Sequence, residues 1–343
     1  MYKRMGEYNR KLENRRIKWI DNGKAIAVIL VGLGHFNCSS IVVKWIYTFH
    51  IPLFLFLSGI TLGTKNSFKV FLGKRIKSLI IPYVTYSLLL DIFTKIVMHK
   101  TEFWKYLDVL SLLKRIFINW RGVYSPYYWY IPALFVAEIL IFLIIKNINK
   151  LSYKIAIWVG IVALQYLKCS VIGVYMLPWD IDIVLELGQF ILLGNIIWNS
   201  FKVYFEKYIL QSNIFVLFIM FIGNLFIGMN NGKVDLYFGC VGNYIKYIVA
   251  AYLGIFMVCN ISYKLRKTFI QYIGQNSLYF YILQEFTFVV ANKMLFFIDL
   301  SIVVFKYIHT IMVNAVGEAL IWVILKGKDK LIRLKEETNE KAI

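Results

Sequence analysis

The chain has 343 residues, 59% of them hydrophobic, and its mean hydropathy is +0.64. A water-soluble protein of this length could not bury so much apolar surface in one core, so the composition excludes an ordinary soluble enzyme. The formal net charge is +20, from 39 Lys and Arg against 19 Asp and Glu. We assign this excess to the inner loops of a membrane protein and expect no nucleic-acid partner.

Apolar runs of roughly 16–24 residues recur along the chain and predict membrane-spanning helices. Only short polar stretches separate them, and no internal repeat or soluble domain is visible. The sequence therefore predicts one all-α membrane domain, residues 1–343, a polytopic helix bundle of about ten spans between residues 18 and 325. The ten predicted spans are 25–36, 43–62, 79–97, 128–145, 153–168, 183–198, 213–230, 244–261, 271–290 and 305–325.

The basic residues predict the orientation of these spans. If the N-terminus is cytoplasmic, the inner segments hold most of the 39 Lys and Arg, whereas the outer segment 169–182 holds none. This asymmetry follows the positive-inside rule and places both termini in the cytoplasm. The outer segment 99–127 is basic as well, and its apolar spacing predicts an amphipathic helix lying at the membrane interface.

Cysteines and the N-terminus add little. The four cysteines form no CxxC pair, so they indicate neither a metal site nor a disulfide framework. Cys38, Cys169 and Cys240 are all expected on the external side of the membrane, where a disulfide remains an alternative. The basic N-terminal stretch has no small-residue cleavage site, so we expect no cleavable signal peptide.

The first span carries three ionisable side chains, Asp21, Lys24 and His35. Such groups at membrane depth are energetically costly, so each is a functional candidate. On an ideal helix Lys24 and His35 lie within about 20° of each other around the axis and ~16 Å apart along it. Asp21 lies within about 40° of the same stripe. The alternative, in which Lys24 reaches the lipid headgroups and His35 lies at the outer interface, stays open.

The second span places His50 two residues before Pro52. Proline cannot donate to the carbonyl of Thr48, so the helix should kink there. A freed carbonyl and an imidazole at a kink suit a polar cavity inside the bundle. Two histidines in the outer halves of adjacent spans predict a shared site. Ser58 and Gly59 mark the inner end of this span, where another helix can approach closely.

Basic residues precede the third span, in the run Lys74-Arg75-Ile-Lys77. Such a cluster at the inner mouth ordinarily satisfies the positive-inside rule. It could also hold phosphates, because the arginine fork makes bidentate contacts with phosphoryl oxygens. The spacing alone leaves both interpretations open.

Taken in chain order, these motifs and several later ones resemble one known family of membrane enzymes. They are Trp19-Ile-Asp21-Asn-Gly-Lys24 leading to Gly34-His35, Phe49-His50-Ile-Pro52-Leu-Phe followed by Ser58-Gly59, Arg75-Ile-Lys77 before Ile81-Pro82-Tyr83, Tyr128-Trp129-Tyr-Ile-Pro-Ala-Leu-Phe135, Leu177-Pro-Trp-Asp-Ile-Asp182 leading to Leu193-Gly194, and Ile273-Gly274-Gln-Asn276-Ser277-Leu278. The sequence resembles the membrane acyltransferase-3 family over roughly residues 17–325, and is most similar to the fucose 4-O-acetylase type of O-acetyltransferase.

The resemblance implies an enzyme that takes an acetyl group from cytoplasmic acetyl-CoA. It delivers the group to a hydroxyl of a cell-envelope or capsular polysaccharide or its lipid-linked sugar precursor. It also implies a multi-pass protein of the plasma membrane, expected to be bacterial. The family's basic residue, ten spacers and histidine map onto Lys24 and His35, although Arg is commoner at the first position. Ser78 and Gln284 stand where the family often has Arg and His, so Gln284 is left out of catalysis.

Acetyl transfer needs a base for the sugar hydroxyl and a donor for the tetrahedral oxyanion. We expect His35 to be the base, because imidazole titrates near neutral pH. His50 would orient that base, stabilise the oxyanion or position the acceptor. Asp21 is the third catalytic candidate, and we expect it to form an ion pair with Lys24 or Arg75. An acyl-histidine intermediate stays open.

Binding roles follow from the same resemblance. Lys24, Arg75 and Lys77 are expected to hold the CoA phosphates at the inner mouth. Ser58 and Trp129 are candidates for substrate contacts, with packing as the alternative for Trp129, and no metal is expected.

Other functions remain as alternatives. A transporter or exporter of glycans or lipid-linked precursors would also have about ten spans, but the sequence has no paired half-chain repeat. A purely structural membrane subunit is the third candidate. Within the enzyme class, succinyl or longer acyl donors and lipid or peptidoglycan acceptors stay open.

Overall fold

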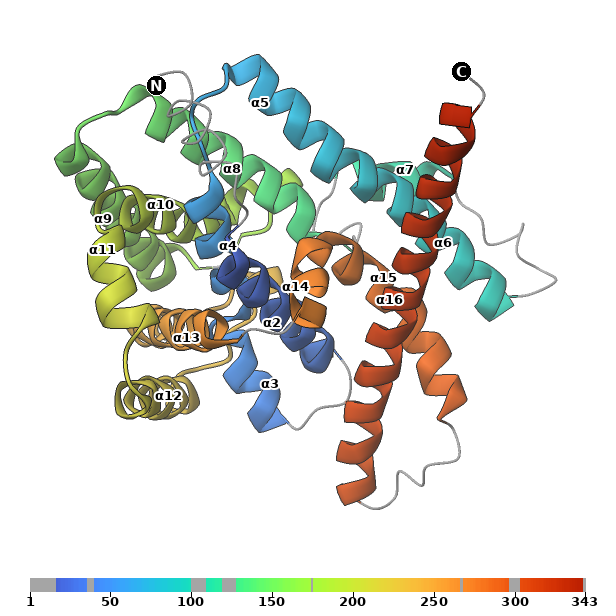
Figure 1. Ribbon diagram of the computed structural model, residues 1–343. Coiled ribbons are helices and arrows are strands. Elements are labelled where there is room, and N and C mark those ends of the chain that lie inside the picture. The colour runs from blue at the N-terminus through green and yellow to red at the C-terminus, as the bar shows by residue number, and fades with distance from the viewer. Residues whose placement is uncertain are drawn as a thin grey trace.

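A computed structural model describes residues 17–35, 40–99, 109–118, 128–173, 175–265, 268–295 and 303–341 (Figure 1). Within these ranges the protein is all-α, as predicted, and a single isolated β-bridge joins Asp235 to Cys240. The helices are α2 (Lys18–His35), α3 (Ser40–Tyr47), α4 (His50–Thr61), α5 (Phe68–Arg75), η1 (Ile76–Ile80), α6 (Ile81–His99), α7 (Val109–Phe117), α8 (Tyr130–Asn147), α9 (Leu151–Leu167), η3 (Lys168–Ile172), η4 (Pro178–Ile183), α10 (Val184–Ser200), α11 (Lys202–Phe205), η5 (Glu206–Leu210), α12 (Ile214–Met229), η6 (Leu236–Phe238), α13 (Tyr244–Lys264), α14 (Thr268–Gln275), α15 (Ser277–Met294) and α16 (Val303–Lys341).

All ten predicted spans fall on helices, but fewer than ten are typical membrane spans. By length and composition, seven segments of the described chain could cross a membrane. An eighth is counted if Lys202–Leu210 and Ile214–Met229, bent by 89°, form one span. The other two predicted spans fall on α2 and on α14 with α15, whose polar side chains lower their hydropathy. The seven are Ser40–Thr61, Phe68–Phe93, Tyr130–Asn147, Leu151–Val171, Pro178–Ser200, Tyr244–Lys264 and Tyr307–Lys330.

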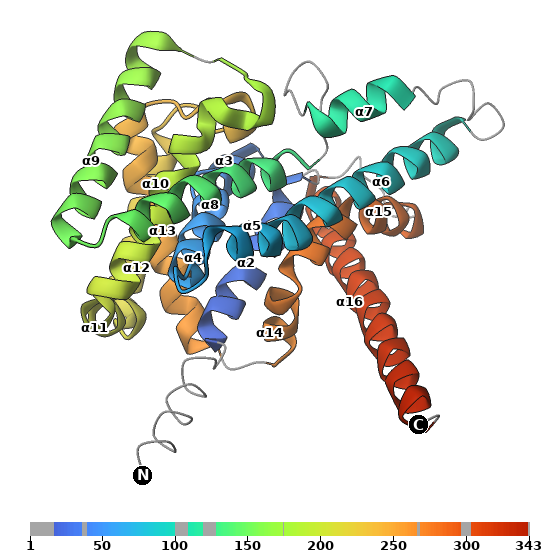
Figure 2. The same ribbon diagram turned by 90° about the horizontal axis from the view of Figure 1, so that it is seen from above.

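The helices form two groups, joined by central helices. In Figure 2, α9 to α13 lie on one side and α6, α7, α15 and α16 on the other. Helix α2 contacts α13 of the first side and α15 and α16 of the second, and it also packs against the central helices α4 and α14. Its buried face is divided accordingly, with Ala27 in the core of the first group and Ala25 and Val28 in the core of the second. Helix α2 therefore holds the two groups together.

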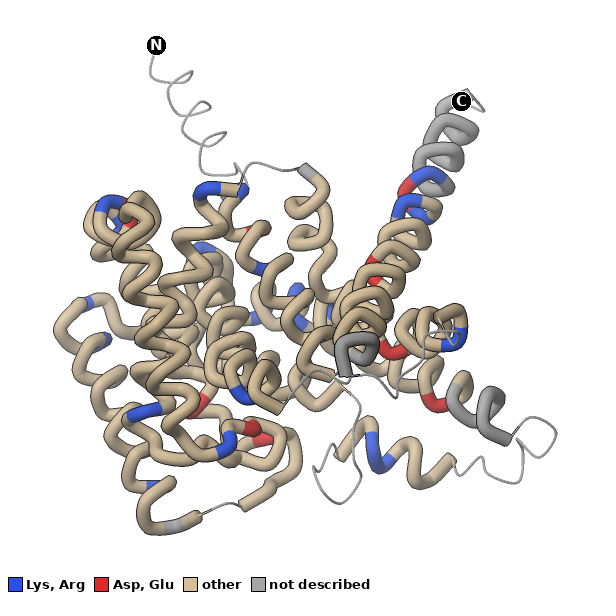
Figure 3. The backbone as a smooth tube through the Cα atoms, turned by 90° about the horizontal axis from the view of Figure 1, so that it is seen from below, with Lys and Arg blue, Asp and Glu red and all other residues tan. Residues whose placement is uncertain are grey.

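Several helix ends carry Lys or Arg (Figure 3), and Lys326, Lys328 and Lys330 lie in the second half of α16. The start of α2 and the end of α16 lie on the same side of the molecule (Figure 2). The cytoplasmic location of both termini stays a prediction.

The predicted interfacial helix is confirmed as a helix in its described part, α7. Leu112 and Ile116 of this helix are buried, and Arg115 forms an ion pair with Asp91 of α6 at 2.8 Å. Leu110, Leu113 and Phe117 are exposed and form an apolar surface. Residues 100–108 and 119–127 lie outside the described ranges, and the membrane position of α7 stays a prediction.

Glycines let α4 and α10 pack with their backbones in direct contact. A Cβ at Gly59 would overlap the backbone of Ile191, and a Cβ at Gly194 would overlap the backbone of Phe56. Asn195 of α10 closes the end of α4 by donating to the carbonyls of Gly59 at 3.3 Å and Leu62 at 3.0 Å. The packing role predicted for Gly59 is thus confirmed.

This contact predicts the effect of adding one methyl group. Replacing Gly59 with Ala should destabilise the fold by about 1–3 kcal/mol, because α4 and α10 must separate to admit the Cβ. The unfolding temperature of the purified protein in detergent measures the loss. Gly160→Ala on α9 is the matched control, because a Cβ there meets nothing within 4 Å. Equal unfolding temperatures for Gly59→Ala and the control would contradict the packing role.

Candidate functional site

A cavity of about 220 Å³ lies between the two helix groups. Its wall comes from α2, the end of α3, α4, α8, α15, the segment around Arg75 and the loop between α12 and α13. The cavity brings together six of the eight predicted site residues: Lys24, His35, His50, Ser58, Arg75 and Trp129.

The other two predicted residues lie outside this wall. Asp21 is buried beside α14, where its carboxylate accepts a hydrogen bond from Gln275 at 3.4 Å. Its backbone packs directly against Gly274, so a Cβ at that glycine would overlap it. Lys77 is exposed on η1. Neither side chain lines the cavity, so their predicted roles gain no support from its geometry.

The cavity has two chemically different ends, because α2 and α4 run antiparallel along it. Gly23 on α2 is adjacent to Leu57 on α4, and the hydroxyl of Tyr47 lies 3.5 Å from the carbonyl of Gly34. Lys24 and Ser58 therefore mark one end, which we call the basic end, and the histidines mark the other, the imidazole end. Along α2 the two ends are separated by ~16 Å.

His50 lies where the second span breaks. Helix α3 ends at Tyr47 and α4 begins at His50, so the predicted kink before Pro52 is confirmed as an interruption. The buried ring of His50 bonds through Nδ1 to the carbonyl of Ile46 at 2.9 Å. Because a carbonyl can only accept, Nδ1 carries the proton, and Nε2 of the neutral ring is the basic atom.

His35 is the last residue of α2 and is exposed at the imidazole end. Among the described residues nothing forms a hydrogen bond with its ring. Tyr47 lies between the two histidines, with its hydroxyl at the end of α2 and its ring centre 5.0 Å from that of His50. His50 is thus held in place by protein contacts, whereas His35 can still reorient toward a substrate.

A second cavity of about 330 Å³ adjoins the first. Of these two cavities, only the first is lined by His50. Seven residues line both: Val31, His35, Tyr47, Trp129, Asp235, Tyr237 and Tyr281. His35 therefore stands where two separate ligands could meet.

Gln284 lines the second cavity. Its amide donates to Glu318 of α16 at 2.6 Å and to the carbonyl of Val28 at 3.0 Å. These bonds join α15 to α16 and α2, so this side chain links three helices, and its exclusion from catalysis stays a prediction.

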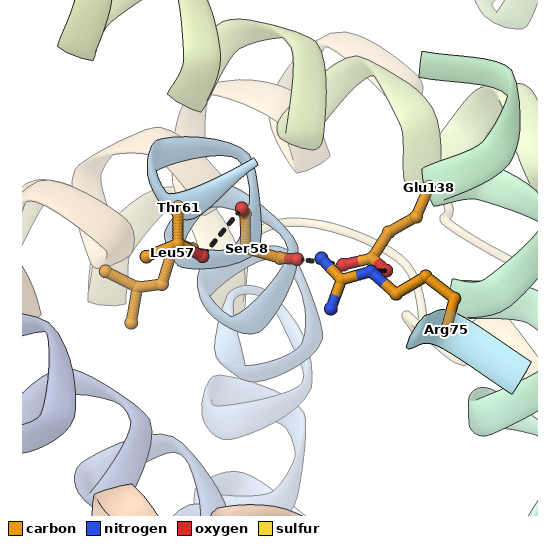
Figure 4. A network of polar contacts seen from close by, with 5 residues as sticks. All are labelled: Leu57, Ser58, Thr61, Arg75 and Glu138. Atoms are coloured by element: carbon orange, nitrogen blue, oxygen red, sulfur yellow. Dashed lines mark hydrogen bonds and ion pairs between the residues drawn. The ribbon is translucent and has the colours of Figure 1, made fainter. Parts of the chain in front are cut away.

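Glu138 is the site residue that the sequence interpretation missed. At the basic end, Arg75 Nε lies 2.8 Å from Glu138 Oε2, and the hydroxyl of Ser58 donates to Glu138 Oε1 (Figure 4). The Glu138 side chain is 2% exposed and that of Arg75 is 27% exposed. The signal was present, because Glu138 is the one acidic residue within the apolar helix α8, and an ionisable group at that depth is a candidate by default.

The side chains of the segment after Arg75 differ in their exposure. Residues 76–80 form a π-helical turn, η1, between α5 and α6. Such turns shift the register of a helix and are frequent at functional sites. Here Leu79 is buried against the cavity while Lys77 is exposed. Arg75 alone of this basic cluster turns inward, toward Glu138.

The chain matches a model of a known protein family. A family model described as an acyltransferase domain matches residues 17–325, which is most of the chain. No curated protein and no solved structure matches it.

The ion pair at the basic end predicts a pattern of stabilities. Arg75→Met should destabilise the protein by up to about 3–5 kcal/mol, because it leaves the buried Glu138 carboxylate unpaired. The double variant Arg75→Met/Glu138→Gln should recover most of that loss, since no buried charge remains. Thermal unfolding in detergent measures both.

The control is the exposed ion pair between Lys202 and Glu206, 3.8 Å apart. Lys202→Met should change the free energy of unfolding by less than about 1 kcal/mol. If Arg75→Met had an equally small effect, the ion pair would not contribute to the fold.

Proposed function

The chain belongs to the membrane acyltransferase-3 family, and from this premise we propose that it is an integral-membrane O-acetyltransferase. It takes the acetyl group from cytoplasmic acetyl-CoA. It transfers the group to a hydroxyl of an extracytoplasmic or lipid-linked sugar of a cell-envelope or capsular polysaccharide, in the plasma membrane of a bacterium. The observation that carries the proposal is one cavity with a basic end and an imidazole end.

The basic end suits the donor. Lys24 and Arg75 line it, and both can attract the phosphates of CoA. Glu138 contacts Arg75 through Nε, and among the described residues nothing bonds to the two Nη groups. The fork is therefore held in one orientation with its outer donors available for phosphoryl oxygens. The flexible pantetheine arm can then carry the thioester along the cavity to the histidines.

The imidazole end suits the chemistry. His35 takes the proton from the sugar hydroxyl as the hydroxyl oxygen attacks the thioester carbonyl. The carbon–sulfur bond then breaks, and the departing thiolate of CoA receives that proton from His35. The products are the sugar ester and free CoA, so the base is regenerated.

His50 has a distinct part in this mechanism. Because its Nδ1 proton is committed to Ile46, the neutral ring offers only an acceptor to the cavity. It therefore cannot donate to the oxyanion, and of the three roles considered for it, positioning the acceptor hydroxyl fits best.

The family assignment leaves the transporter alternative without support, and a direct assay tests the rest. Inverted membrane vesicles supplied with labelled acetyl-CoA should transfer label to glycan. His35→Ala should lower the rate by about 10²–10⁴-fold, the usual effect of losing a general base. His309→Gln is the control, because this histidine is buried on α16 away from both cavities. Absence of label on glycan in the wild type would contradict the proposal.

The donor assignment has its own test. The double variant Arg75→Met/Glu138→Gln removes the phosphate-binding fork without leaving a buried charge. We expect its KM for acetyl-CoA to rise about tenfold or more, since a charged hydrogen bond contributes roughly 1.5–3 kcal/mol. Steady-state kinetics on folded protein measures it. An unchanged KM for acetyl-CoA would mean that Arg75 contributes only to the stability of the fold and does not bind the donor.

A further inference from the structure

The loop between α12 and α13 forms part of the cavity wall at the imidazole end. Asp235 and Tyr237 line both cavities, together with His35. No sequence motif assigned this loop a role, and the donor mechanism above does not use it.

The loop is held in one conformation by its own hydrogen bonds. Asp235 and Cys240 exchange backbone bonds of 2.6 and 3.0 Å. Asn231 spans the base of the loop, donating to the carbonyl of Val241 at 2.9 Å and accepting from the amide of Asn243 at 2.8 Å. Gly242 has φ +65°, and a Cβ there would lie 2.7 Å from Asn231 Oδ1, so only glycine fits. Asp235 and Tyr237 are therefore presented to the cavity in a fixed arrangement.

The loop presents the carboxylate of Asp235 beside the aromatic ring of Tyr237. The ring of Tyr237 lies 5.9 Å from that of Trp129 and 4.8 Å from that of Phe238, centre to centre. Asp235 Oδ2 lies 3.0 Å from the ammonium of Lys233, and the Asp235 side chain is only 14% exposed. This carboxylate thus lies at the cavity wall with its acceptor oxygens largely shielded from solvent.

Such a surface is complementary to a sugar ring. A pyranose has an apolar face of C–H bonds, which packs against aromatic rings, and a rim of hydroxyl donors, which a carboxylate can accept. Ligand sites in general combine aromatic walls with a few placed polar groups. The position beside His35 would bring one hydroxyl of the bound sugar to the base.

We propose that Asp235 and Tyr237, together with Trp129, form the subsite that binds the acceptor sugar. Asp235 accepts hydrogen bonds from the hydroxyls next to the one that reacts, and the two aromatic rings contact the apolar face. Because a carboxylate repels another carboxylate, the subsite selects a neutral sugar ring over a uronic acid. The inference rests on the proposed function for the identity of the second substrate as a sugar.

The test uses the purified full chain in detergent, with labelled acetyl-CoA as donor and a panel of neutral and uronic methyl glycosides as acceptors. Asp235→Asn and Tyr237→Ala should each raise the acceptor KM about tenfold or more. The affinity for CoA, measured by calorimetry, should stay unchanged. Tyr237→Phe should retain the wild-type KM, because it keeps the ring.

Lys233→Met is the matched control within the loop. This lysine side chain is 74% exposed, and its removal leaves Asp235 in place, so the acceptor KM should change less than about twofold. If Tyr237→Ala proves unstable, the isosteric Asp235→Asn variant decides the question.

The outcomes separate this inference from the proposed function. Acetyl transfer with an unchanged acceptor KM in Asp235→Asn and Tyr237→Ala would overturn the subsite and leave the function intact. Saturable binding of neutral glycosides, followed by tryptophan fluorescence and lost in Asp235→Asn, would support the subsite even if no acetyl group were transferred. Neither transfer nor binding by the wild type would overturn both.

Discussion

The ion pair between Arg75 and Glu138 is the contact on which the cavity depends. It joins the end of α5 to α8, and the hydroxyl of Ser58 brings α4 into the same network. A carboxylate as buried as Glu138 must find a cationic or hydrogen-bonding partner, because an unpaired charge in an apolar interior is strongly destabilising. The three segments are thus fixed to one another at the basic end. The same constraint leaves an arginine fork facing a cavity rather than the lipid headgroups.

The cavity explains why helices α2 and α15 carry polar side chains. Helix α2 and helix α15 are less apolar than the candidate spans, and both contribute to the cavity wall. Lys24 and His35 on α2 can be tolerated at depth because they face a cavity between helix groups. The remaining face of α2 packs through small residues such as Ala25 and Ala27, which are fully buried. Helix α2 can therefore join both groups, because one of its faces lines the cavity and its other faces pack closely against neighbouring helices.

Much of this organisation was predictable, and the exceptions have physical reasons. Helix positions follow from apolar runs, and the grouping of His35, His50 and Arg75 follows from costly ionisable groups at membrane depth. Seven or eight of the ten predicted spans are long and apolar enough to cross a membrane, whereas α2 and α15 have lower hydropathy because they carry polar side chains of the cavity wall. Glu138 was overlooked as a lone acid in an apolar helix. Asp235 could not be placed, since only the fold brings a loop 200 residues from His35 to the same wall.

The two ends of the cavity are built differently, and this division suits their proposed partners. Lys24, Ser58, Arg75 and Glu138 lie on helices, and the buried ion pair restricts substitution there. Asp235 belongs to a loop whose conformation depends on its own backbone bonds, so its side chain can change without disturbing helix packing. The proposed donor, acetyl-CoA, is one fixed molecule and suits a rigid site, whereas a sugar acceptor can vary in its ring and its hydroxyls. Placing acceptor recognition on a loop carried by a rigid scaffold allows specificity to change independently of the chemistry.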